Sequence, residues 1–276
     1  MQNEILITLG ITILFLGTCI TPSAAIDTVE QCSMPISSGN TLYVGGTGEG
    51  NYSSIQAAID DASDGDTVFV YDDSSPYYEN VVVDKSINLI GENRDTTIID
   101  GIGIGDIIYI SIDWIDISGF TIQNGSKSGL KVISNLNTIH DNNIILNNGN
   151  GIFLDEQCGY NNIIGNSISK NNIGISISFS YDNTIEFNNI ENNKCGLSAL
   201  AFGYCSNLIQ KNNFIKNKRH AKFLSVSVRD TWDSNYWDNW IGVKVKLPFF
   251  QRLPKIIFGF FQIDFDWNPT KKPYII

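Results

Sequence analysis

Apolar residues recur at fixed intervals along the middle of the chain, between residues 118 and 232. One column advances by 22, 24, 22 and 24 residues, through Ile122, Ile144, Ile168, Ile190 and Phe214. A second column follows a glycine in each repeat, at Leu130, Ile152, Ile175 and Leu197. A third comprises Ile139, Ile164, Ile185 and Ile209. A constant period of this length marks a repeat architecture, in which each unit buries its apolar face against its neighbours.

Within each repeat, apolar and polar residues alternate over short runs, as in residues 173–178 (IGISIS). Such alternation predicts a β-strand, because successive side chains of a strand point to opposite faces. Three runs fit into a repeat of about 23 residues, which leaves short corners and no room for helices. The pattern predicts an all-β fold, a single-stranded right-handed parallel β-helix with three short strands per coil. Neighbouring coils of this solenoid should lie about 4.8 Å apart.

Asparagine occupies the corners between these strands in three further columns. The first comprises Asn142, Asn166, Asn188 and Asn212. The second comprises Asn147, Asn171, Asn192 and Asn217, and the third Asn137, Asn162, Asn183 and Asn207. Asn tolerates the left-handed backbone conformation that a sharp corner needs. Stacked Asn side chains can also form hydrogen bonds from coil to coil, so we expect Asn ladders at the corners.

The two ends of the repeat region depart from its pattern. Residues 53–63 predict a short helix, because Ile55, Ala58, Ile59 and Ala62 fall on one face and Ser53 with Gln56 forms a possible capping box. This helix would cap the open end of the stacked strands. We expect the β-helix domain to span residues 41–232, and the aromatic-rich residues 233–276 to cap its other end.

The first 25 residues read as a secretory signal peptide. Residues 5–20 are apolar and uncharged, and the small residues Ser23, Ala24 and Ala25 follow, as a signal peptidase requires. An uncleaved anchor, or a lipid anchor on Cys19, is an alternative. Residues 26–40 read as a linker, and the mature protein is expected to be exported, extracellular or at the cell surface.

Charge is distributed unevenly along the chain, whose net charge is −11. Residues 26–210 hold six Lys/Arg and 23 Asp/Glu, a balance of −17, whereas residues 211–276 hold twelve Lys/Arg and five Asp/Glu, a balance of +7. An acidic body argues against a nucleic-acid partner. After cleavage four cysteines remain, without a CxxC spacing, and we expect mostly buried free thiols at Cys32, Cys158, Cys195 and Cys205.

Several segments together resemble one known family. The apolar leader, the SIQAAIDDASDGDTVFV cap (residues 54–70), the Asn-rich repeats and the ending NYWDNW…PYII are similar to the NosD-type β-helix family. That family belongs to the wider class of carbohydrate-binding and sugar-hydrolase β-helices. The resemblance covers residues 41–276 and implies the same fold in an exported protein. The family takes its name from a periplasmic accessory protein for copper-site assembly. This chain is basic and apolar at residues 243–262, where an acidic, glycine-rich stretch is usual.

Neither copper nor catalysis is well supported by the residue pattern. Copper needs His, Met or Cys donors, and His140, His220, Met34 and the cysteines form no cluster, so we predict no metal site and no cofactor. Glycosidases need paired carboxylates, but Asp141 aligns with Gly165, Phe187 and Lys211. We therefore assign no catalytic residue. The early coils, with Asp100, Asp106, Asp113 and Asp116, leave a polysaccharide lyase or glycoside hydrolase open.

The sequence favours an exported, non-catalytic scaffold or binding protein for carbohydrate or an envelope component. Alternatives are a polysaccharide-active enzyme and an accessory factor for copper-site maturation. Candidate carbohydrate-binding residues are Trp114, Trp232, Asp233, Trp237, Asp238 and Trp240. The alternative is that these aromatic side chains only close the C-terminal end of the solenoid. Candidate residues for peripheral docking on a membrane or envelope surface are Lys244, Lys246, Phe249, Phe250, Arg252 and Lys255. Their mixture of basic and aromatic side chains is typical of interfacial segments.

Overall fold

A computed structural model describes residues 39–201, 206–225, 230–240, 244–247, 250–252, 254–258 and 263–276. The predicted signal peptide (1–25) and nearly all of the linker (26–40) lie outside these residues. No helix within the described ranges has the length and apolarity needed to cross a membrane.

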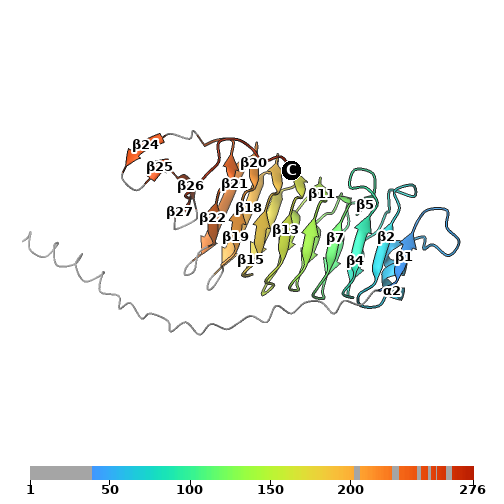
Figure 1. The fold of residues 1–276 in the computed structure, drawn as a ribbon. Coiled ribbons are helices and arrows are strands. Elements are labelled where there is room, and N and C mark those ends of the chain that lie inside the picture. The colour runs from blue at the N-terminus through green and yellow to red at the C-terminus, as the bar shows by residue number, and fades with distance from the viewer. Residues whose placement is uncertain are drawn as a thin grey trace, which may run out of the picture. The chain divides into compact units, whose positions relative to one another are not determined.

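The predicted all-β parallel β-helix is confirmed: successive strands join three sheets in turn, and from β4 to β21 each coil contributes one strand to each sheet (Figure 1). Sheet A runs in the order β1 (Thr41–Val44), β2 (Thr67–Val70), β4 (Asn88–Gly91), β7 (Asp116–Ser118), β10 (Thr138–His140), β13 (Asn162–Ile164), β16 (Thr184–Glu186), β19 (Leu208–Gln210), β22 (Thr231–Asp233), β27 (Ile263–Asp266) and β26 (Lys255–Phe258).

The other two parallel sheets follow the same coils. Sheet B contains β5 (Ile98–Asp100), β8 (Thr121–Gln123), β11 (Asn143–Ile145), β14 (Ser167–Ser169), β17 (Asn189–Glu191), β20 (Asn213–Ile215) and β23 (Tyr236–Trp237). Sheet C contains β3 (Val81–Val83), β6 (Ile108–Ile110), β9 (Ser128–Val132), β12 (Asn150–Leu154), β15 (Ile173–Ser178), β18 (Cys195–Ala201) and β21 (Arg219–Ser225). A separate hairpin pairs β24 (Lys244–Leu247) with β25 (Phe250–Arg252).

Two of the predicted apolar columns are confirmed in register. The column through Ile122, Ile144, Ile168, Ile190 and Phe214 pairs residue by residue along sheet B, and all five side chains are fully buried. The column from Leu130 to Leu197 does the same along sheet C. The third column was wrong at one position. Ile163, not Ile164, pairs with Ile139 and Ile185, and Ile164 faces outward beside His140 and Glu186. A slip of one residue moves a strand side chain to the opposite face.

The Asn ladders exist, with two corrections to their membership. The first column is confirmed, and each Asn donates its side-chain amide and its backbone N–H to the side-chain oxygen of the next, at 3.0–3.2 Å between Asn142 and Asn166. In the other two columns the ladder residues are Asn193 and Asn161 rather than Asn192 and Asn162. Each predicted residue is the exposed neighbour of the buried one.

The corner positions predicted a left-handed backbone conformation for the ladder asparagines. The buried ladder asparagines do not adopt it. The residue before nearly every ladder Asn does, as at Asp141 (φ 52°), Phe187 (φ 53°) and Lys211 (φ 54°). These residues are of several types, so the corner does not require Asn for its backbone geometry. The buried Asn is required for its hydrogen bonds, because each side chain satisfies polar backbone groups that turn inward at the corner.

Each ladder ends on an acceptor that is not asparagine. The ladder through Asn212 passes to Asn235, whose two N–H donors reach Asp266 at 3.0 and 3.1 Å. The ladder through Asn207 ends on Asp230 (2.8 and 3.2 Å), and the side chain of Asn217 approaches Nδ1 of His220 at 3.4 Å. All amides in a ladder point the same way, so a carboxylate or an imidazole nitrogen completes the hydrogen-bonding pattern at its end.

Asp230 should make stability depend on pH. Burial raises the pKa of its carboxyl to about 6 from 3.8, against the opposing effect of the hydrogen bonds from Asn207. Between about pH 4 and pH 6 the folded state therefore keeps a proton that the unfolded state has released. Stability should fall as pH rises through this window, by up to about 3 kcal/mol. Asp230→Asn removes this ionisation, so the variant should gain stability over wild type at pH 8 but not at pH 4. Melting temperatures of both proteins at the two pH values test this; an equal difference at both would contradict it.

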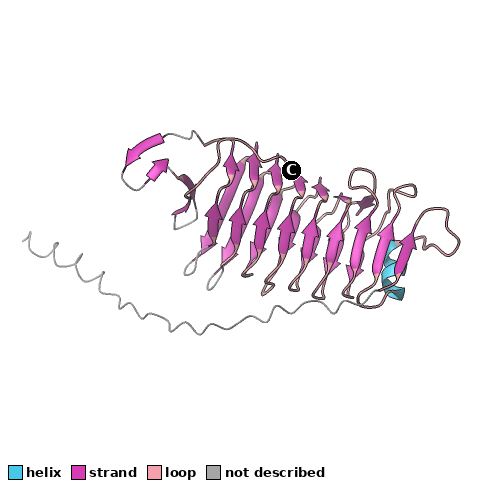
Figure 2. Ribbon diagram, in the orientation of Figure 1, coloured by secondary structure: helices cyan, strands magenta, loops and turns pink. Residues whose placement is uncertain are grey.

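The predicted N-terminal helix is α2 (Ile55–Asp61), the cyan element in Figure 2. Its apolar face is confirmed, because Ile55, Ala58 and Ile59 are buried against the first coil. The predicted capping box was wrong. Ser54 is the N-cap and accepts from the N–H of Ala57, while the carboxylate of Glu79 accepts from the N–H groups of residues 55 and 56 at 2.9 and 3.0 Å. A contact from another coil thus begins this helix.

Parallel pairing continues past the predicted boundary at residue 232. Strand β23 extends sheet B, and Trp237 stacks on Phe214 with ring centroids 4.3 Å apart and an interplanar angle of 7°. Strand β27 then pairs with β22, and β26 adds the last, antiparallel strand of sheet A. Large aromatic rings thus cover the end of the apolar core at the last coil of the described residues.

Candidate functional site

Basic side chains gather where sheet C meets the last strands of the chain. Two adjoining hollows of about 500 and 310 Å³ share Lys218 and Arg219 in their walls. The other cations that line them are Lys194, Lys222 and Lys255. We call this surface, defined by these five cations, the basic groove. The described residues that line it include no carboxylate.

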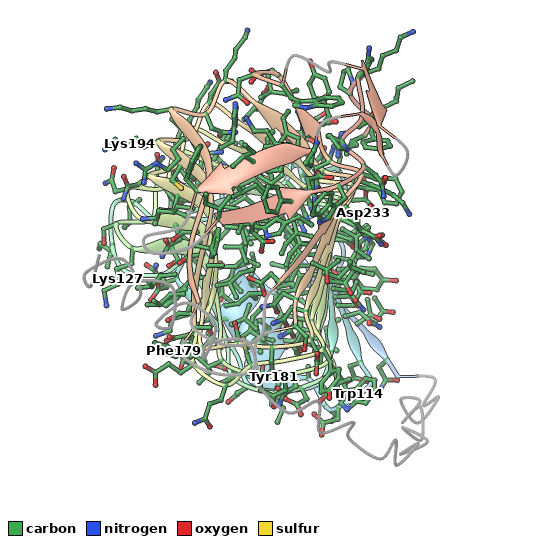
Figure 3. The ribbon with its side chains drawn as sticks, turned by 90° about the vertical axis from the view of Figure 1, so that its left-hand side faces the viewer. Trp114, Lys127, Phe179, Tyr181, Lys194 and Asp233 are labelled. Atoms are coloured by element: carbon green, nitrogen blue, oxygen red, sulfur yellow. The ribbon has the colours of Figure 1, made fainter. Side chains whose placement is uncertain are left out.

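The coil register explains why these cations meet. Strands β18 and β21 pair Cys195 with Arg219 and Ser198 with Lys222. Lys194 and Lys218 directly precede this pairing, so they occupy equivalent corners of successive coils, about 4.8 Å apart. Figure 3 shows Lys194, at one of these corners, on the left-hand side of the molecule. Lys255 comes from β26, which packs beside β21.

Asp238 lies behind the groove, and its oxygens are already engaged. One accepts from Nε2 of His220 at 2.8 Å, and the other accepts from the backbone N–H of Lys216 at 2.6 Å. Burial lowers the pKa of His220, and Lys255 lowers it further, although Asp238 opposes both. His220 is therefore neutral at pH 7. It takes the place of the glycines at equivalent positions of earlier coils, such as Gly196, and fills the corner where its ladder ends.

Lys255 is half-buried, as is Lys222, whereas the other three groove cations are exposed. The ammonium group of Lys255 donates to Oδ1 of Asn239 at 2.6 Å and lies 5.9 Å from the centre of the Trp237 ring. Burial lowers the pKa of Lys255, and the charge of Asp238 raises it in part. Exposed apolar side chains, Ile256 and Phe258, border the same hollow. The groove therefore offers positive charge beside apolar surface, which suits an anionic ligand that also presents non-polar faces.

A second polar row crosses the outer face of sheet C toward the N-terminus. Lys131 pairs with Asp155 at 2.9 Å, and its ammonium lies 5.9 and 5.7 Å from the ring centres of Tyr109 and Phe153. The hydrogen bond to Asp155 raises the pKa of Lys131 against the effect of burial. Because Asp155 already balances its charge, this row attracts anions less strongly than the basic groove.

The family of this chain follows from its similarity to known proteins. The family model described as "Periplasmic copper-binding protein (NosD)" matches residues 36–242, which is most of the chain. The chain belongs to the NosD family. Its fold is also similar to that of a pectin methylesterase from carrot (14% identity, TM-score 0.46, covering 74% of this chain and 79% of that one). A second similar structure is Geobacillus virus E2 ORF18 (13% identity, TM-score 0.40, covering 66% and 53%). A comparison with curated proteins found no match.

The copper named in the NosD family description does not fit the described residues of this chain. Both ring nitrogens of His140 are engaged by Asp116 (3.0 Å) and Asp141 (2.8 Å), and His220 is held by Asp238. Cys158 and Cys195 are free and buried, as predicted, and burial raises the pKa of both thiols, to about 11 for Cys158. Within the described ranges, no group of His, Cys, Asp and Glu side chains is placed to hold a metal ion. Met34, Cys32 and Cys205 lie outside those ranges.

The predicted carbohydrate-binding residues are not gathered on one surface in this NosD-family chain. Trp232 and Trp237 are 3% and 1% exposed, so their rings are part of the core and present no face for a sugar. Trp240 packs against that core. Asp238 is engaged with His220, and Asp233 accepts from Ser234 and Asn268. Trp114 belongs to an early coil, and it and Asp233 lie on the side opposite Lys194 in Figure 3.

The predicted docking residues divide between two places. Lys255 lines the basic groove. In the β24–β25 hairpin the backbone of Lys244 pairs with that of Arg252, and Leu247 pairs with Phe250. Lys246 lies in the same hairpin, and Phe249 lies outside the described residues. The sequence prediction missed Lys194, Lys218, Arg219 and Lys222. The available signal was the +7 balance of residues 211–276, which contain three of these four.

Proposed function

We propose that this NosD-family protein is an exported, non-catalytic binding protein that holds an acidic polysaccharide in the basic groove. The single observation that carries the proposal is the set of five cations lining a groove with no carboxylate among its described lining residues. The chain as a whole has a net charge of −11. A carboxylated ligand is therefore repelled by most of the surface and attracted here.

The spacing of the cations favours a polymer over a small anion. Lys194 and Lys218 repeat at the coil spacing of about 4.8 Å, so a ligand that carries a charge on successive units can meet several of them at once. Two adjoining hollows also provide more length than a single anion fills. The non-polar faces of sugar rings suit Ile256 and Phe258.

The triple variant Lys218→Gln, Arg219→Gln, Lys222→Gln should weaken binding of an alginate hexamer at least tenfold. Each exposed charge pair contributes up to about 1 kcal/mol, and three are removed. The affinity is measured by isothermal titration calorimetry with residues 26–276, which contain the whole described fold. The matched control Lys170→Gln, Lys271→Gln, Lys272→Gln makes the same change in net charge at exposed positions that do not line the groove. Equal weakening in both variants, with unchanged melting temperatures, would refute the groove as the binding site.

A second candidate function, cleavage of a polysaccharide, is favoured by one cluster on sheet A. His140 bridges Asp116 and Asp141, and all three side chains are partly exposed. Burial lowers the pKa of His140, but the two carboxylates outweigh this effect and the net shift is upward. An imidazolium between carboxylates can donate a proton. Release of reducing ends from the titrated sugars, abolished by Asp116→Asn, would support an enzyme and contradict a purely binding role.

A further inference from the structure

The last hairpin of the solenoid carries an exposed apolar face. Strands β26 and β27 are antiparallel, and they pair Ile256 with Phe265 and Phe258 with Ile263. Ile256, Phe258 and Ile263 are 44%, 67% and 47% exposed. The alternate residues point the other way: Ile257 and Asp266 are buried against the body. The hairpin is therefore amphipathic, with its apolar side toward solvent.

Trp267 extends this face beyond the end of β27. It is 49% exposed, and its ring lies 4.9 Å from that of Phe265. We call Ile256, Phe258, Ile263, Phe265 and Trp267 the hairpin face. Contiguous exposed apolar side chains on a sheet are a mark of an interaction surface. Buried Asp266 anchors the hairpin from behind, since it accepts from Trp237 (2.9 Å) and from Asn235.

Positive charge borders the hairpin face. Ile256 and Phe258 line the same hollow as Lys218, Arg219 and Lys255. Residues 211–276 as a whole carry twelve Lys/Arg and five Asp/Glu. An apolar surface rimmed by cations has the composition of segments that lie in the interface of anionic membranes.

We propose that the hairpin face docks this protein on the surface of an anionic lipid bilayer. Four-residue strands reach about 13 Å, whereas a bilayer core is about 30 Å thick, so the hairpin lies at the interface and does not span it. The acidic coils before residue 211 are repelled by anionic lipid while the last 66 residues are attracted, which orients the molecule with its C-terminal end toward the membrane. A second copy of the chain fits the face poorly, because two ends of charge +7 repel each other.

Co-sedimentation with vesicles tests this proposal. Residues 26–276 should pellet with vesicles that contain phosphatidylglycerol and remain in solution with phosphatidylcholine alone. Phe258→Ser, Ile263→Ser should reduce pelleting at least tenfold. The control Ile102→Ser, Ile104→Ser alters two isoleucines of an early loop that are 57% and 59% exposed, and it should pellet like wild type. Fluorescence emission should shift to the blue on vesicle binding, and Trp267→Phe should reduce that shift.

Three outcomes would overturn docking on lipid: no pelleting of wild type, equal pelleting with neutral vesicles, or equal loss in the hairpin variant and the loop control. A dimer in solution that Phe258→Ser, Ile263→Ser dissociates, without vesicle binding, would instead assign the face to a second copy. Ile263→Ser alone alters the hairpin face at a residue that does not line the groove, so it should reduce pelleting and leave the alginate affinity equal to that of wild type. Polysaccharide binding and membrane docking can thus fail independently.

Discussion

Ile168→Asp should destabilise the solenoid more than any other change considered. Ile168 is fully buried, and it stacks between Ile144 and Ile190 in neighbouring strands of sheet B. The variant loses the burial of a large apolar side chain and places an unpaired carboxylate in the core. The expected loss is at least about 4 kcal/mol, among the larger effects of single substitutions. For a domain of this size, that loss lowers the melting temperature by about 10 °C or more.

Ile164→Asp is the matched control for this variant. Ile164 is an isoleucine of the same coil, on β13, but its side chain faces outward between His140 and Glu186. A carboxylate there remains in contact with water, so the melting temperature should change by no more than a few degrees. If Ile164→Asp unfolded the protein and Ile168→Asp did not, the assignment of inward and outward positions would be reversed.

Asn166→Ala should have the second largest effect. The side-chain oxygen of Asn166 accepts from the backbone N–H (3.0 Å) and the amide (3.2 Å) of Asn142, and its own amide donates to three oxygens, including that of Asn188. The alanine variant leaves these buried groups without partners, at about 1–3 kcal/mol each where no water replaces the amide. The expected loss is about 3 kcal/mol, or about 6–12 °C in melting temperature.

Asn162→Ala and Asn192→Ala are controls with a second purpose. Both residues are exposed, yet the sequence pattern placed them in the ladders. The structure places Asn161 and Asn193 there instead. Each control should therefore change stability by less than about 0.5 kcal/mol. A loss as large as that of Asn166→Ala in either control would restore the ladder membership predicted from sequence.

These errors show what the repeat pattern can and cannot determine. The period, the sheet-B and sheet-C columns and the first ladder could be predicted, because coils with a lone apolar or Asn residue, as at Ile168 and Asn166, fix the register of the others. Where two identical residues adjoin, as at Ile163–Ile164 and Asn192–Asn193, the prediction chose the outward one, although the 24- and 22-residue steps of the first column fit Ile163 and Asn193. Corner geometry decides, through a left-handed residue directly before the ladder Asn, such as Asn192 before Asn193.

The site was less predictable than the fold, for two physical reasons. The groove cations come from β26 and two successive coils, and only a register accurate to one residue brings Lys194 beside Lys218. The tryptophans Trp232 and Trp237 were plausible sugar platforms by residue type. They are buried because they close the apolar core at the last coil of the described residues. Residue type alone does not separate a platform from a plug.

The most direct test of the proposed function compares two forms of one ligand. An alginate hexamer and its fully methyl-esterified form share the same sugar backbone, and only the acid carries charge. Isothermal titration with residues 26–276 in about 50 mM salt should show saturable binding of the acid and none of the ester. The affinity for the acid should fall at least about tenfold in about 500 mM salt, because exposed charges are then screened beyond a few Å. Equal binding of both forms, or no binding of the acid, would contradict the proposal that the basic groove recognises an acidic polysaccharide.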